Sequence, residues 1–240
     1  MAMAAARSMI LHRGLSFASA GHLPLRAALG FRLRGPDVCS QWQMSAQRRC
    51  IAEVAAPGLP GAQRLSDIAK VPLLAKEAPS KVRDLWLENF QHKEHIVAGV
   101  LAQEEYKALK AASKECPMFL VPVPRGSGYV NFVWQAQGNR FAYSTLEGFQ
   151  QQGASSVDFG VTLYEELLVS HKIVLLYGEL FSQALTKPEG AAIIKYTREA
   201  YADPARLTWV KRFNHSPREF SYEEFLQEFR PLERWQGAAS

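Results

Sequence analysis

The sequence has few cysteines and lacks the common catalytic motifs. Only three of its 240 residues are cysteine, and none forms a C-x-x-C pair. It contains no phosphate loop of the G-x-x-x-x-G-K-[S/T] type, no G-x-G-x-x-G after a strand, no H-E-x-x-H and no G-x-S-x-G. We therefore predict no catalytic residue, no metal site and no cofactor. No apolar run reaches the roughly 20 residues of a membrane-spanning helix, and we expect no stable membrane insertion.

The positions of the cysteines limit disulfide formation. Cys39 and Cys50 lie in the first 52 residues, which leaves Cys116 alone in the rest of the chain. An intrachain disulfide is then impossible once the first segment is removed, as suits a reducing compartment. We interpret Cys116 as a small buried apolar residue. The alternative, a nucleophile, would need a lowered pKa and a neighbouring base.

The first 52 residues lack lysine and contain a single acid, Asp37, beside seven arginines. The whole chain has a net charge of +5, yet the remainder is nearly neutral, which argues against nucleic-acid binding. An arginine-rich, serine-containing, acid-poor segment is typical of organelle transit peptides. We predict a disordered mitochondrial transit peptide over 1–52, cut near residue 50 after Arg48-Arg49. A plastid address is the alternative, disfavoured because arginines outnumber the five serines; a disordered basic tail is another.

Composition divides the rest of the chain. Residues 53–63 are rich in proline, glycine and alanine and are predicted to be a linker. Residues 64–236 are dense in apolar and aromatic side chains, and their number suits one domain with its own core. Residues 237–240 are expected to be a short tail.

Hydrophobic periodicity predicts the secondary structure of this domain. Val82, Leu85, Trp86 and Phe90 follow helical spacing, whereas Val130, Phe132 and Trp134 alternate as in a strand. Pro122 and Pro124 confine the strand Met118–Val123 to an edge or an early end. We predict helices over 80–91, 103–114, 146–152 and 188–201, and strands over 96–101, 118–123, 129–135, 141–146, 157–163, 173–177 and 207–213.

The C-terminal segment carries two S-x-x-E patterns, Ser216–Glu219 and Ser221–Glu224, each typical of a helical capping box. Together with a hairpin signal at Gly138-Asn139, these elements predict an α+β fold. We expect a mainly antiparallel sheet with helices packed on one face, in a single domain that follows the disordered leader.

Three short patterns are judged coincidental. Asp158-Phe159-Gly160 matches a kinase tripeptide without its catalytic-loop context, and Arg125–Gly128 suits a hairpin turn. His92 and His95 have no further zinc ligands nearby in the sequence, and neither do His171 and His215.

Several segments, taken in order, resemble a known family. They are Leu65–Ile68, Leu85-Trp86, Cys116–Arg125 followed by Gly-x-Gly-Tyr, Ile173–Glu179 and Phe213–Tyr222 with its F-N-x-x-P-x-x-F-x-Y spacing. From about Leu65 to Phe229 the chain resembles the mitochondrial assembly chaperones that bind the β subunit of the F1 sector of ATP synthase.

The resemblance implies a chaperone of the mitochondrial matrix and not an enzyme. Such a protein holds unassembled β subunit and shields the surface that the α subunit later covers. Its partner is this subunit and no nucleic acid, and we expect a monomer. The same resemblance leaves open an equivalent chaperone for a plastid ATP synthase.

Five residues of the last matching segment are candidate partner contacts, because aromatic side chains often anchor interfaces. They are Phe213, Asn214, Pro217, Phe220 and Tyr222. The competing interpretation gives the two phenylalanines to the core and Asn214 to a turn. Edge pairing of Met118–Val123 with the client is a second candidate.

Two other classes of protein stay possible on sequence alone. One is a small-ligand-binding α+β module of the organelle matrix, with a pocket lined by Trp134, Tyr143 and Trp209. The other is an enzyme with an unfamiliar site, which the missing motifs disfavour.

Overall fold

A computed structural model describes residues 63–126 and 128–229 of the chain. The predicted transit peptide, nearly all of the predicted linker, the end of the predicted domain and the tail lie outside the described residues. The predicted boundaries at 52, 63 and 236 therefore stay predictions. Within the described part of the chain, no helix is both long and apolar enough to cross a membrane.

A six-stranded sheet forms the centre of the fold, and every neighbouring pair in it is antiparallel. The order is β1-β6-β5-β4-β3-β2, so β1 and β2 are the edges. The predicted α+β class with a mainly antiparallel sheet is confirmed, and so is the edge position of Met118–Val123. The strands are β1 (Ile96–Ala102), β2 (Met118–Arg125), β3 (Gly128–Gln137), β4 (Arg140–Thr145), β5 (Phe159–Tyr164) and β6 (Ile173–Leu180).

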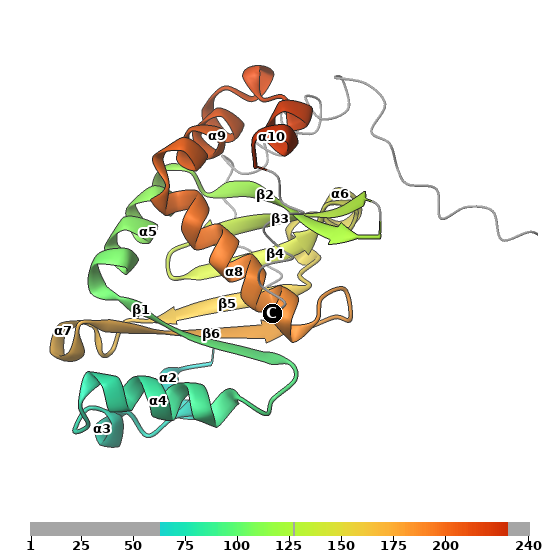
Figure 1. The fold of residues 1–240 in the computed structure, drawn as a ribbon. Helices are drawn as coiled ribbons and strands as arrows, with labels where there is room; N and C mark the ends of the chain where they lie inside the picture. Colours follow the sequence, from blue (N-terminus) through green and yellow to red (C-terminus); the bar gives the residue numbers. More distant parts are fainter. Residues whose placement is uncertain (1–62, 127, 230–240) are drawn as a thin grey trace, which may run out of the picture. The chain divides into compact units, whose positions relative to one another are not determined.

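Helices surround this sheet (Figure 1). The four helices predicted over 80–91, 103–114, 146–152 and 188–201 are present, each within one residue at either end. The helices of the described residues are α2 (Leu65–Ile68), α3 (Val71–Leu74), α4 (Pro79–Phe90), α5 (Gln103–Glu115), α6 (Leu146–Gln152), α7 (Leu168–His171), α8 (Lys187–Ala202), α9 (Pro204–His215) and α10 (Tyr222–Phe229), with short 3-10 turns η1 (Gly153–Ser155) and η2 (Pro217–Glu219).

Alternate side chains of β1 enter two different cores. Val97 and Leu101 join the larger core, whereas Ile96 and Val100 join a smaller one with residues of α4. Because the strand is covered on both faces, it is almost continuously apolar. A Cβ at Gly190 would lie 3.1 Å from Val97 Cγ2, so this glycine lets α8 approach β1 closely.

The helices therefore form two layers of unequal size. α8 crosses one face of the sheet and contacts both edge strands, with α5 and α9 beside it (Figure 1). On the other face α4 packs against β1, and Trp86 Nε1 donates a hydrogen bond to the Leu176 carbonyl oxygen at 3.0 Å. The predicted packing on one face holds for α5, α8 and α9, and α2–α4 add a smaller layer on the opposite face.

The strand predicted over 207–213 is wrong, because these residues belong to α9. Asp203 is the N-cap and accepts a hydrogen bond from the Ala205 amide at 2.9 Å, while Pro204 occupies the first turn. Trp209, Val210 and Phe213 are buried at helical spacing. The helix-start signal at Asp203-Pro204 therefore outweighs the strand-like run of apolar residues that follows it.

Candidate functional site

Phe213 and Phe220, two of the predicted contact residues, lie in the core. Their side chains are only 4 % and 7 % exposed. Both pack edge-to-face on Phe119 of β2, with ring centroids 5.4 and 6.0 Å away. Trp209 and Phe225 complete this aromatic cluster, which holds β2, α9, η2 and α10 together.

Asn214 binds the edge of the sheet. Its Oδ1 accepts a hydrogen bond from the Met118 amide at 3.3 Å, and its Nδ2 donates to the Met118 carbonyl oxygen at 2.6 Å. The side-chain amide thus pairs with the first residue of β2 as a neighbouring strand would. Further along, Pro122 and Pro124 lack the N–H groups that an added strand needs. A client strand that paired with the edge of β2 would therefore find few free backbone N–H donors there.

Pro217 and Tyr222 are half-buried beside the same cluster. Pro217 opens the 3-10 turn η2, where Ser216 makes no capping hydrogen bond, so the first predicted capping box is wrong. The second pattern does cap: Ser221 Oγ accepts from the Glu224 amide at 3.3 Å. Tyr222 donates its hydroxyl hydrogen to Asn131 Oδ1 of β3 at 2.7 Å. The fold thus gathers all five predicted residues at α9, η2 and α10, three of them partly accessible.

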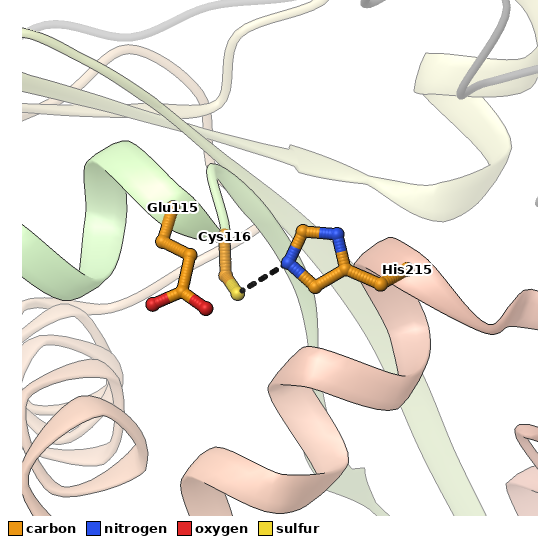
Figure 2. A group of neighbouring side chains, drawn as sticks. All are labelled: Glu115, Cys116 and His215. Carbon is orange, nitrogen blue, oxygen red and sulfur yellow. Dashed lines mark hydrogen bonds between the residues drawn. The ribbon is translucent and has the colours of Figure 1, made fainter.

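A second group of chemically active side chains lies at the ends of α5 and α9 (Figure 2). Cys116 Sγ is 3.4 Å from His215 Nε2. With Glu115, their ligand atoms all lie within 4.8 Å of one another. Cys116 is buried, whereas Glu115 and His215 are exposed. His215 has no ligand partner nearby in the sequence, but the fold brings it next to Cys116, which is 99 positions away.

The electrostatic surroundings of Cys116 keep its thiol protonated. Burial and the neighbouring Glu115 carboxylate raise the pKa of Cys116 to about 11, and Lys211 opposes them only in part. The Lys211 ammonium lies 3.1 Å from Glu115 Oε1. A nucleophilic cysteine needs a lowered pKa, so this thiol lacks the reactivity of a catalytic one at neutral pH.

An apolar groove lies between α3 and α4. It has a volume of about 300 Å³ and is lined by nine residues: Ile68, Ala69, Lys70, Leu73, Leu74, Glu77, Leu85, Trp86 and Asn89. Leu73 is 56 % exposed, and Leu87 on α4 is 41 % exposed. The groove is hard to predict from sequence, because α2 and α3 are single turns too short for a clear periodicity.

The three aromatic residues considered for a ligand pocket are part of the closed core. Trp134, Tyr143 and Trp209 are at most 4 % exposed. Trp134 Nε1 donates to the Tyr201 hydroxyl at 2.9 Å, and the Tyr143 hydroxyl donates to Thr197 Oγ1 at 3.1 Å. The polar atoms of Trp134 and Tyr143 are thus used within the fold, and none of the three residues lines the groove.

Comparison with known proteins assigns the chain to a family. A family model described as "ATP11 protein" matches residues 39–226, which is most of the chain. The chain belongs to the ATP11 family. The ATP11 match includes the aromatic cluster, the Cys116–His215 pair and the groove, and it ends within α10.

Curated relatives agree with the ATP11 assignment. The chain is 28 % identical over 167 residues to the protein called ATP synthase mitochondrial F1 complex assembly factor 1 of Homo sapiens, and equally to that of Mus musculus. The matched part is 68 % of this chain and 51 % of each relative. The chain therefore spans about half the length of the curated relatives it matches.

Proposed function

We propose that this chain is an assembly factor for the F1 complex of mitochondrial ATP synthase. The observation that carries the proposal is its membership of the ATP11 family, together with the names of its human and mouse relatives. The arginine-rich first segment supports a mitochondrial address, and we propose the matrix as the compartment.

We further propose that the protein acts as a chaperone and not as an enzyme. The buried Cys116, with its raised pKa, is poorly suited to nucleophilic catalysis. Most other buried polar groups are engaged in structural hydrogen bonds, such as those of Trp134 and Tyr143.

The proposed client is the unassembled β subunit. A β subunit made for an αβ ring exposes an apolar interface before assembly, and such a surface aggregates. Covering a standard interface of roughly 800 Å² per partner would suffice to hold it. The chaperone, monomeric in this proposal, would shield the α-contacting surface until the α subunit replaces it.

The proposed contact surface includes the partly accessible residues Asn214, Pro217 and Tyr222. Phe213 and Phe220 would support this surface from beneath, since their side chains are buried. The groove at Leu73 is the rival surface, because its exposed apolar lining offers what a chaperone needs.

A capture experiment in mitochondrial extract tests the function. The tagged chain should enrich ATP synthase β without ATP synthase α. Enrichment of intact ATP synthase, or of neither subunit, would contradict the proposal. A co-purifying metabolite or substrate turnover would instead favour the small-ligand or enzyme alternatives.

Substitutions at two positions, Tyr222 and Leu73, locate the contact. Tyr222→Ala should reduce capture of β at least tenfold, whereas Tyr222→Phe, which keeps the ring and removes the hydroxyl that binds Asn131, should retain it. Leu73→Ser should leave capture unchanged. The reverse pattern would move the contact surface to the groove. Circular dichroism of each variant checks that the fold is intact.

A further inference from the structure

The ends of two helices meet at the group Glu115, Cys116 and His215. Glu115 is the last residue of α5, Cys116 is its C-cap, and His215 is the last residue of α9. A helix C-terminus carries a partial negative charge that favours cations. Both helix ends therefore add partial negative charge where the carboxylate, the thiol and the imidazole lie together (Figure 2).

The distances suit a small metal ion. Zinc binds sulfur at about 2.3 Å and imidazole nitrogen at about 2.0–2.1 Å, so tetrahedral geometry separates these two ligand atoms by about 3.5 Å. Cys116 Sγ and His215 Nε2 are 3.4 Å apart. The Glu115 carboxylate lies within 4.8 Å of both, close enough to become a third ligand after a small side-chain rotation.

The ammonium of Lys211 already places a positive charge beside the Glu115 carboxylate. Lys211 and His215 are one helical turn apart on α9 and face the same way, and the Lys211 ammonium lies 3.1 Å from Glu115 Oε1. Both side chains of this ion pair are about half exposed, so the pair is weak and easily displaced.

We propose that Cys116, His215 and Glu115 form a binding site for Zn²⁺, with water as the fourth ligand. Binding replaces the thiol proton, which leaves to solvent, and also displaces Lys211 from Glu115. The bound ion joins the end of α5 to the end of α9, next to the pairing of Asn214 with Met118. A metal site here goes beyond the proposed function.

The test uses the full chain with Cys39→Ser and Cys50→Ser, so that Cys116 is its only thiol. Co²⁺, a spectroscopic substitute for Zn²⁺, should give thiolate-to-cobalt charge-transfer absorption and tetrahedral ligand-field bands at one equivalent. Zn²⁺ should abolish both signals. Titration calorimetry with Zn²⁺ should give one site, and Zn²⁺ should raise the melting temperature.

Single substitutions in that chain assign the ligands. Loss of a supporting group alone weakens metal sites about 10–100-fold, so Cys116→Ser and His215→Gln should each weaken Zn²⁺ binding at least that much. Lys211→Gln should tighten binding, because it removes the competing cation, a result that an unrelated surface site would not give. His92→Gln, an exposed histidine elsewhere, is the matched control and should change nothing.

Two results would overturn the site. One is the absence of the charge-transfer band in the folded parent chain, which would leave the Cys116–His215 contact as an ordinary hydrogen bond. The other is unchanged Zn²⁺ affinity in His215→Gln. His215 is exposed, so this variant decides the matter even if Cys116→Ser unfolds.

Discussion

At the residue scale, the pKa of the Glu165 carboxylate is strongly lowered. Burial raises its pKa, but hydrogen bonds from Lys110, Tyr106 and Asn139 outweigh burial and lower the pKa from 4.5 to about 2. Tyr106 and Lys110 both bind Glu165 Oε1, at 2.6 and 2.8 Å. The carboxylate thereby connects α5 to the end of β5 and to the β3–β4 turn.

We predict that Glu165 stabilises the fold only while it is ionised. A lowered folded-state pKa gives stability that is complete above the unfolded pKa of 4.5 and is lost as the pH falls toward 2. Glu165→Gln should therefore lower the free energy of unfolding at neutral pH, and the difference from wild type should shrink from about pH 5 to about pH 3. Urea unfolding at each pH measures it. Glu166→Gln, at an exposed neighbour, is the control for loss of a nearby surface carboxylate and should change the free energy of unfolding little. A pH-independent gap for Glu165→Gln would contradict the prediction.

The burial of a residue was easier to predict than its long-range contacts. The sequence indicated that Cys116 is buried, and it is 0 % exposed. It gave no signal that His215 touches Cys116, because a contact across 99 positions depends on how α9 packs on β2. Asn214 was noted as a candidate contact or turn residue, yet its pairing with the Met118 backbone needs the same tertiary arrangement.

At the scale of elements, four helices were predicted to within one residue, whereas one apolar run was assigned to the wrong type of element. Leu146–Gln152 was predicted to the residue, and Thr145 caps it by accepting a hydrogen bond from the Gly148 amide at 3.2 Å. The 207–213 segment failed because a short apolar run suits either a strand or a buried helix. Only the cap at Asp203 distinguishes the two.

The aromatic cluster around Phe119 predicts the effect of truncating Phe220. Phe220 is 7 % exposed and contacts Phe119, Trp209, Phe213 and Phe225. Phe220→Ala should lower the free energy of unfolding by about 3–5 kcal/mol, since it leaves a cavity among close-packed rings. Chemical denaturation measures the loss.

A matched control for Phe220→Ala is Phe181→Ala, whose ring is 38 % exposed. It should cost much less, near the ±0.5 kcal/mol typical of surface changes. Equal losses in the two variants would show that the cluster does not hold η2 and α10 in place. Client capture should then be compared only at temperatures where Phe220→Ala is still folded, so that lost binding is not confused with unfolding.

At the scale of the whole molecule, the sheet is covered by helices on both faces, and its edge strand β2 is closed to pairing by Asn214 and two prolines. A protein that contacts an aggregation-prone client benefits from this arrangement, because it cannot easily add a client strand to its own sheet. Binding through side chains is also easier to reverse than strand addition, which suits a temporary role.

Reversibility leads to a prediction about release. If the chain covers the surface of β that α later contacts, the two proteins compete for β, and the more extensive αβ contact should win. Purified α subunit added to a complex of this chain with β should release the chain, and the released fraction should rise with the concentration of α. Size-exclusion chromatography would follow the chain as it moves from the complex to the free position, with serum albumin as a control that releases nothing. A stable complex containing the chain, β and α together would place the contact elsewhere on β and contradict the shielding mechanism.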